Sequence, residues 1–246
     1  MHPTAPAPLT PALPSGYTAV VLGASGALGQ AFVQALQSDA RCGRVLGLAR
    51  RSEGRTPGSP ALVLDDEATL AACAAWLAPQ GPLHLVVDAT GALTLDGRGP
   101  EKRLDELDAN HLARAFAVNT IGPALALKHL GPLLATQERA IWAKLSARVG
   151  SIGDNRKGGW YGYRAAKAAL NMVLQTAAIE LGRRRPHLVV AALQPGTVRS
   201  NLSRPFVGEA GSAPAEAAQA LLAVLHQLPA AANAQFVDHR GQTLPW

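Results

Sequence analysis

Residues 17–37 read YTAVVLGASGALGQAFVQALQ and combine an aliphatic run, a glycine-rich turn and a stretch with helical periodicity. The run at 17–22 has the length and the residue types of a buried strand. Residues 23–29 contain three glycines, and the helical pattern continues over residues 30–37. A strand, a glycine turn and a helix in this order place backbone N–H groups and the amino end of a helix against a phosphate group. The stretch therefore predicts a dinucleotide site.

Aliphatic runs and helical patterns alternate along the rest of the chain. Further strands are expected at residues 45–49, 61–64, 83–87, 140–145, 187–193 and 234–238, and helices at 68–77, most of 104–134, about 160–182 and 215–227. This alternation predicts an α/β fold: a single-domain, Rossmann-type, doubly wound parallel sheet of about seven strands with helices on both faces, over residues 17–246. Residues 1–16 hold five prolines and are expected to form an extended or disordered lead-in.

Composition limits the classes of protein that fit. Hydrophobic residues make up 48% of the 246 residues and aromatic ones only 4%, so the core must consist of alanine, leucine and valine. Cys42 and Cys73 are too few for a disulfide framework and lack metal-ligand spacing, so we expect free thiols and no metal. The net charge of +6 is spread thinly, and its densest cluster, Arg183-Arg184-Arg185, follows a helix and suits that helix's dipole. No nucleic-acid partner and no membrane span are expected, and the protein should be soluble and cytoplasmic.

Tyr163 and Lys167 are the leading candidates for catalysis. Residues four apart lie on one face of a helix, so the phenol and the ammonium would sit side by side. A close positive charge favours the phenolate, which brings the phenol pKa nearer to neutral pH. Such a pair can act as general acid and base on a carbonyl or an alcohol. Without further motifs, a packing tyrosine beside a solvated lysine is the commoner arrangement, so the interpretation depends on the surroundings.

Polar residues follow several of the expected strands. Arg50 and Arg51 follow the second strand, where arginine accommodates a 2′-phosphate and an acidic residue would bind ribose hydroxyls. They therefore favour NADP over NAD, although two solvated loop arginines would give the same pattern. Asp65 follows the run at 61–64, where a side chain could contact adenine. Asn119 lies in an apolar stretch and should have a specific partner if it is buried.

These motifs, in this order, resemble those of the classical short-chain dehydrogenase/reductase family over roughly residues 17–246. Within that family, residues 151–164 and the ending Leu244-Pro245-Trp246 are most similar to the C-factor and sniffer-type carbonyl reductases. The resemblance implies that Tyr163 gives a proton to a substrate carbonyl as hydride arrives from NADPH. It implies that Lys167 lowers the tyrosine pKa and holds the nicotinamide ribose, and that Asn119 supports a water that links Lys167 to solvent.

The same resemblance implies a set of cofactor-binding residues. Besides Tyr163 and Lys167, they are Gly23, Ser25, Gly26, Ala27, Leu28 and Gly29 at the pyrophosphate, Arg50, Arg51 and Asp65 at the adenosine, and Ala89, Thr90, Gly91, Pro195, Gly196, Thr197 and Val198 further along. Three positions depart from the family pattern. Ala27 replaces a glycine, Ser200 replaces a threonine, and Asp88 replaces an asparagine. We expect the Asp88 carboxylate to accept hydrogen bonds from backbone N–H groups.

A fourth departure concerns the serine that orients the substrate. Alignment on Val149-Gly150 puts this position at Ala147, with Ser146 one residue before it and Ser151 four residues after it. Successive strand side chains point to opposite faces, so Ser146 reaches the substrate only if the strand end twists. Both serines remain candidates, and Ser146 is slightly favoured as the catalytic one.

The combined prediction is an NADP(H)-dependent carbonyl reductase that acts on a small carbonyl or alcohol. The alternative is a regulatory or signalling protein that binds NADP(H) with little turnover, which the missing serine favours. Apolar residues in the loop 195–214, Leu202, Pro205, Phe206 and Val207, suggest an apolar substrate. The family resemblance also implies a homodimer or homotetramer that pairs through the helices near 104–134 and 160–182.

Overall fold

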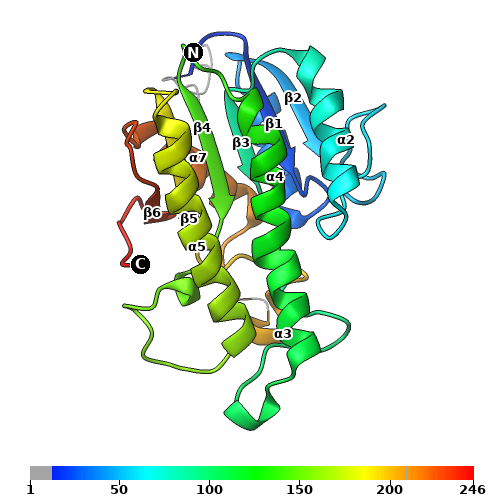
Figure 1. Ribbon diagram of the computed structural model, residues 1–246, viewed down its shortest axis with the longest axis vertical. Coiled ribbons are helices and arrows are strands. Elements are labelled where there is room, and N and C mark those ends of the chain that lie inside the picture. Colours follow the sequence, from blue (N-terminus) through cyan, green and yellow to red (C-terminus); the bar gives the residue numbers. More distant parts are fainter. Residues whose placement is uncertain (1–12, 209) are drawn as a thin grey trace, which may run out of the picture.

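Six parallel strands form the sheet at the centre of the molecule (Figure 1). The computed structural model describes residues 13–208 and 210–246. The strands are β1 (Tyr17–Leu22), β2 (Cys42–Leu48), β3 (Leu85–Asp88), β4 (Ala140–Leu145), β5 (Leu188–Gln194) and β6 (Gln235–Asp238), in the order β2-β1-β3-β4-β5-β6. Every residue of β1, β3 and β4 is buried, as expected for parallel strands covered on both faces. The predicted Rossmann-type fold is confirmed.

Helices cover both faces of the sheet. On one face lie α2 (Glu67–Leu77), α4 (Gly122–Leu130) and α5 (Tyr161–Gly182), whose leucines and alanines pack with Trp142. On the other face lie α1 (Ala27–Gln37) and α7 (Pro214–Gln227), which pack around Phe32. Figure 1 shows α4 and α5 side by side in front of the sheet. The remaining helices are α3 (Ala109–Phe116), α6 (Arg204–Val207), the 3₁₀ turns η1 (Ala78–Gln80), η2 (Leu104–Glu106), η4 (Gly131–Leu133) and η5 (Arg148–Gly150), and the π-helix η3 (Ala117–Ile121).

The run at residues 61–64 does not join the sheet, which has six strands in the described part of the chain instead of about seven. Leu62 N–H donates to Ala49 O at 3.0 Å, which is one bond of a ladder. At the next residue, Val63, both backbone groups bond to the Thr69 hydroxyl. This hydroxyl accepts from Val63 N–H at 3.1 Å and donates to Val63 O at 3.0 Å. The ladder therefore stops after one residue.

The predicted helix over 104–134 consists of several pieces. The π-helix η3 connects α3 to α4 and contains Asn119. A π-turn inserts an extra residue into a helix and is frequent at functional sites. Figure 1 shows α3 continuing α4 below the edge of the sheet.

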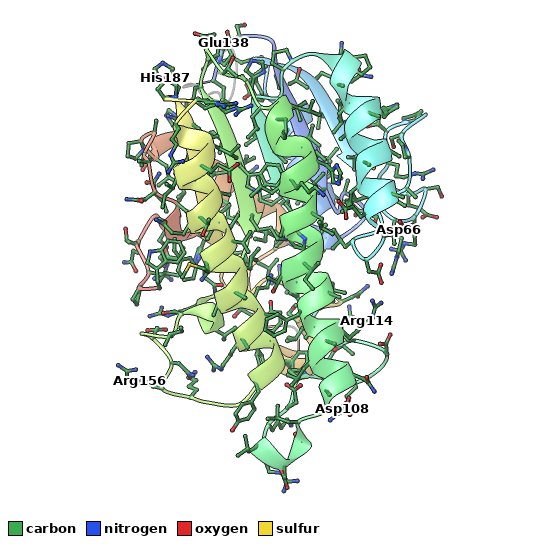
Figure 2. All side chains as sticks on the ribbon, viewed as in Figure 1. Asp66, Asp108, Arg114, Glu138, Arg156 and His187 are labelled. Atoms are coloured by element: carbon green, nitrogen blue, oxygen red, sulfur yellow. The ribbon has the colours of Figure 1, made fainter. Side chains whose placement is uncertain are left out.

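The carboxyl ends of the strands form the edge on which the candidate residues gather. In Figure 2, Glu138 and His187, which precede β4 and β5, lie at the opposite end of the molecule from Asp108 and Arg156. The ligand of a doubly wound sheet lies beyond the carboxyl ends. Figure 1 shows that α3 and the loop before α5 lie beyond this edge of the sheet.

The expected lead-in falls mostly outside the described residues, which begin at Leu13. Leu13 itself is buried and packs in the cluster that contains Tyr17 and Phe32. Both cysteines are free thiols, as predicted. Within residues 13–208 and 210–246, every helix is either too short or too polar to cross a lipid bilayer.

Candidate active site

Tyr163 and Lys167 lie together on the first two turns of α5. Lys167 Nζ is 5.6 Å from the centroid of the Tyr163 ring. The same amine donates a hydrogen bond of 3.1 Å to the carbonyl oxygen of Leu145, the last residue of β4. Lys167 is only 2% exposed and Tyr163 is half-buried. The helix thus holds a phenol and an amine against the carboxyl end of the sheet, as the spacing predicted.

The electrostatics of this pair differ from the expectation. Burial raises the pKa of Tyr163 above its ordinary value. Burial, followed by the positive charge of Lys144, lowers the pKa of Lys167 well below its ordinary value. Desolvation disfavours the charged form of each group, and here it outweighs any help from Lys167 to the phenolate. Tyr163 is therefore a protonated phenol at neutral pH, which is the form that donates a proton.

Asn119 is fully buried and holds the loop after β3. Its Oδ1 accepts from Ala92 N–H at 3.0 Å, and its Nδ2 donates to Ala92 O at 2.9 Å and to Ala115 O at 3.1 Å. The predicted specific partner is thus the backbone of Ala92. A Cβ placed on the neighbouring Gly91 would lie 3.2 Å from Asn119 Oδ1 and 3.4 Å from Lys167 Nζ. The structure brings these predicted residues together.

The glycine turn between β1 and α1 has the shape of an anion cradle. Gly23 has φ +78°, and a Cβ on Gly29 would lie 2.1 Å from Gly23 O, so the turn and the helix touch through backbone alone. Gly26 is the N-cap of α1 and supplies no side-chain cap, and the first turn holds no acidic residue. The first N–H groups of a helix have no partner within it, so this end of α1 fits a pyrophosphate. Ala27 is accommodated as the first helical residue.

Arg50, Arg51 and Asp65 lie at the edge that would hold the adenosine. The Arg50 side chain is exposed and makes no hydrogen bond or ion pair with residues 13–208 and 210–246, while Arg51 lies 4.0 Å from Glu53. Asp65 binds the guanidinium of Arg114 (labelled in Figure 2), whose hydrogen bond lowers the pKa of that carboxyl. Arg50 is therefore available for a phosphate, whereas Asp65 already has a cationic partner.

Neither candidate serine hydrogen-bonds to Tyr163 or Lys167. Ser146 Oγ donates to Asn171 Oδ1 on α5 at 2.7 Å. Ser151 Oγ accepts from Asp154 N–H at 3.0 Å and lies 3.4 Å from the carbonyl oxygen of Trp246. Both hydroxyls bond within the fold, and Ala147 brings no hydroxyl to the position between them.

The loop after β5 contains Pro195, Gly196, Thr197 and Val198. In the sheet, β3 and β4 separate β5 from β1, which the glycine turn follows. Gly196 has φ +75°, and a Cβ there would lie 2.9 Å from the His239 ring. Thr197 O accepts from Ser212 N–H at 3.0 Å, which fixes the base of the loop after β5. Sequence reasoning missed His239, because nothing in its surroundings along the chain relates it to Gly196.

An aromatic wall stands next to Tyr163. Trp160 is the N-cap of α5 and has φ +54°, a left-handed conformation that non-glycine residues rarely adopt. Its ring lies edge-on to Tyr163 and to Phe206 of α6, with centroids 6.3 Å and 5.3 Å away. Strained residues of this kind cluster at functional sites. Phe206 belongs to the loop that was expected to cover the substrate.

Sequence reasoning also missed Lys144, the partner of Asp88. Thr90 N–H donates to Asp88 Oδ1 at 2.9 Å, so the expected backbone hydrogen bond is present. Lys144 Nζ lies 3.0 Å from the same oxygen, and neither charged residue is exposed to solvent. A lysine inside an otherwise aliphatic strand was the signal that could have revealed the pair.

Comparison with known proteins identifies the family. Residues 24–235 match the sequence model of a family described as enoyl-(acyl carrier protein) reductase. The chain belongs to the short-chain dehydrogenase/reductase family. The 1-hydroxy-2-glutathionyl-2-methyl-3-butene dehydrogenase of Rhodococcus sp. (strain AD45) is 32% identical over 189 residues, 76% of this chain and 79% of that protein. The C-signal protein of Myxococcus xanthus is 29% identical over 167 residues, 68% of this chain and 94% of that protein.

Solved structures of the family have the same fold. A short-chain dehydrogenase/reductase from Burkholderia multivorans with bound NADP has a TM-score of 0.79 and 25% identity, over 94% of this chain and 99% of that one. Carbonyl reductase Sniffer of Drosophila melanogaster has a TM-score of 0.80 and 20% identity, over 93% and 99% of the two chains. The predicted likeness to C-factor and sniffer-type proteins is confirmed, in sequence for C-signal and in fold for Sniffer. The protein belongs to an oxidoreductase family.

Proposed function

We propose that this short-chain dehydrogenase/reductase uses NADP(H) to interconvert a small carbonyl compound and its alcohol, with Tyr163 as the proton donor. The observation that supports this most strongly is the placement of Tyr163. Its phenol lies beside Lys167 on α5, and Lys167 in turn lies beside Gly91 and Asn119 at the carboxyl ends of the strands. A reducing enzyme needs a protonated acid at this edge, and burial keeps the phenol protonated.

The cofactor would lie along this edge of the sheet. The turn at residues 23–29 would hold the pyrophosphate. Arg50 and Arg51 would bind a 2′-phosphate, and Asp65 would contact the adenosine. The loops at 89–91 and 195–198 would border the nicotinamide, and Lys167 would hold its ribose. When bound, the nicotinamide ring supplies or accepts the hydride. Two observations favour NADP: within residues 13–208 and 210–246 the exposed Arg50 side chain makes no hydrogen bond or ion pair, and the related Burkholderia structure holds NADP.

The chain's own residues orient the substrate and move one proton. In the reductive direction the carbonyl oxygen would accept a hydrogen bond from the Tyr163 hydroxyl and take its proton. Asn119 holds the Ala92 backbone and so fixes the loop beside Lys167. With Ala147 at the position of the usual serine, Tyr163 would be the main hydrogen-bond donor to that oxygen. Losing one such donor typically lowers kcat by about 10²–10³.

The aromatic wall favours an apolar carbonyl substrate. The Trp160 ring lies beside Tyr163 and the Phe206 ring lies against Trp160, and aromatic rings bury large apolar areas. An apolar or aromatic aldehyde, ketone or diketone fits this wall better than a charged one. A comparison of kcat/KM between benzaldehyde-type and short polar carbonyls tests this, and a preference for the polar set would contradict it.

Self-association through α4 and α5 is also proposed. An apolar groove of about 470 Å³ runs between these helices, and Met172 on its rim is 66% exposed. Large exposed apolar patches mark interaction surfaces. Light scattering should give the mass of a homodimer or homotetramer, and the mass of a single chain would refute the proposal.

The decisive experiment follows NADPH oxidation optically with a panel of aldehydes, ketones and diketones. Turnover should disappear in Tyr163→Phe, which removes the donated proton and keeps the ring. Tyr161→Phe is the matched control, because it removes the same hydroxyl from Tyr161, the exposed first residue of the same helix. Equal activity of Tyr163→Phe and the native protein would contradict the assignment.

The second candidate is a regulatory protein that binds NADP(H) with little turnover. It is favoured by the placement of Ser146 and Ser151, whose hydroxyls bond within the fold. Tight NADPH binding without turnover on the whole panel would support it. Turnover that depends on Tyr163 would exclude it.

A further inference from the structure

A buried ion pair lies directly below the reacting edge. Asp88 and Lys144 are register partners at the ends of β3 and β4, and both are 0% exposed. Removing two charges from water is unfavourable, and an apolar pair of similar size is often as stable or more stable. Stability alone therefore does not explain a pair at this position.

The pair fixes the residue that follows β3. Lys144 Nζ donates to Thr90 O at 2.6 Å and to Thr90 Oγ1 at 3.1 Å. Thr90 N–H and Oγ1 donate to Asp88 Oδ1 at 2.9 Å and 2.5 Å. Lys144 Nζ also donates to Asp88 Oδ1 at 3.0 Å and lies 3.4 Å from Asp88 O, so within the described part of the chain all the acceptors of this amine belong to Asp88 and Thr90. Backbone and side chain of Thr90 are thus both held by the pair.

Thr90 leads directly into the active site. Gly91 follows it with φ +145°, and a Cβ there would lie 3.4 Å from Lys167 Nζ and 3.2 Å from Asn119 Oδ1. Any movement of Thr90 would therefore move the backbone that borders the active-site amine. Thr90 and Gly91 thus connect the ion pair to Lys167.

We propose that Asp88 and Lys144 are positioning residues of this site: they hold the Thr90–Gly91 turn against Lys167 and set the electric field in which Lys167 works. The inference rests on the proposed function for its catalytic meaning. The effect of these charges on the protonation of Lys167 is a property of the folded protein, so it can be measured without turnover.

The charges act on Lys167 in opposite directions. Burial has the largest effect and lowers the pKa of Lys167. The charge of Lys144 lowers this pKa further, and the charge of Asp88 raises it by a smaller amount. The other groups that face the amine are the Tyr163 ring on α5, Asn119 in η3 and the carbonyl oxygen of residue 145 in β4. Among these groups only Tyr163 titrates, and it is neutral at physiological pH.

The test measures the protonation of Lys167 directly. Lysine labelled with ¹³C at Cε is followed by NMR against pH, and the Lys167 signal is assigned by its loss in Lys167→Arg. Lys144→Met should raise the titration midpoint of Lys167, and Asp88→Asn should lower it, each by roughly 0.5–1 pH unit. The pH profile of kcat/KM for carbonyl reduction should move in the same directions.

A double variant and a remote control complete the design. Asp88→Asn with Lys144→Met removes both charges, so it should raise the midpoint by less than Lys144→Met alone, and it stays informative if either single variant fails to fold. Glu138→Gln removes the carboxylate that contacts His84 at the opposite end of the sheet and should leave the midpoint unchanged. A midpoint of the double variant that is not below that of Lys144→Met or not above that of Asp88→Asn, or shifts in one direction in both single variants, would overturn the inference. Absence of turnover with the expected NMR shifts would count against the proposed function alone.

Discussion

Replacing Gly29 with alanine tests the close approach of α1 to the turn that precedes it. The added Cβ would lie 2.1 Å from Gly23 O, 2.8 Å from Gly23 C and 2.9 Å from the Cα of Ala24. Contacts below 3.0 Å do not persist, so the helix and the turn must separate by about 0.9 Å at the closest atom pair. Both sides of the contact are backbone, so no side chain can rotate away to relieve it.

The magnitude follows from two opposing effects. Alanine in a helix interior is favoured over glycine by up to about 1 kcal/mol. Forcing an extra carbon into a packed contact costs about 1–3 kcal/mol, and backbone on both sides puts Gly29 at or above the upper end. We therefore expect a net loss of about 2 kcal/mol in the free energy of unfolding, or roughly 30-fold in the folding equilibrium.

Urea denaturation measures the loss in stability, and a fluorescence titration measures NADPH affinity. The dissociation constant for NADPH should rise at least tenfold, because the displaced turn is the one that would hold the pyrophosphate. Gly26→Ala is the matched control: its Cβ would meet only Gly23 O at 3.4 Å, an ordinary contact, so its stability should change by less than about 1 kcal/mol. If Gly29→Ala were as stable as Gly26→Ala and bound NADPH as tightly as the native protein, the reasoning about this contact would be refuted.

Three further outcomes are expected. The pKa of Lys167 is lower in the folded state than in the unfolded chain, so the unfolded chain binds more protons at Lys167 between the two values and the contribution of Lys167 to the free energy of unfolding rises with pH in that range. In urea titrations from pH 7 to 10, the free energy of unfolding of the native protein should therefore increase relative to that of Lys167→Met as the pH rises. Burial raises the pKa of the Cys73 thiol to about 11, so mass spectrometry after iodoacetamide treatment at pH 8 should find Cys42 modified first and Cys73 only in denaturant. Asn119→Ala should lower the free energy of unfolding by about 2–4 kcal/mol in urea, because Ala92 loses partners for both its N–H and its carbonyl; a loss below 1 kcal/mol would contradict this.

The sequence predicted the architecture well because its signals are local. The alternation of aliphatic runs with helical patterns predicts parallel strands and crossover helices. The glycine turn predicts where α1 begins. Tyr163 and Lys167 could be paired because four residues of helix separate them. The exception was the run at 61–64, which has strand composition. A single threonine hydroxyl takes the hydrogen bonds that a neighbouring strand would need.

Features that depend on distant contacts could not be predicted. The partner of Asp88 is 56 residues away along the chain, and only the register of β3 against β4 brings the two together. The direction of the pKa shift at Tyr163 likewise follows from burial, which no local pattern reveals. For Ser146, the alternation of side chains along a strand did point away from the substrate, and the bond to Asn171 agrees with it.

The Asp88–Lys144 pair also has a consequence for how the chain finds its strand pairing. β3 pairs with β4 over four residues, and the other three pairs are Leu85–Ile141, Val86–Trp142 and Val87–Ala143. Aliphatic pairs tolerate a slip of two residues, because each side chain stays on the same face of the sheet. The same slip would bury the Asp88 carboxylate opposite Trp142 or Ser146, without a cation. The two charges thus penalise misaligned sheets and select one alignment of β3 against β4.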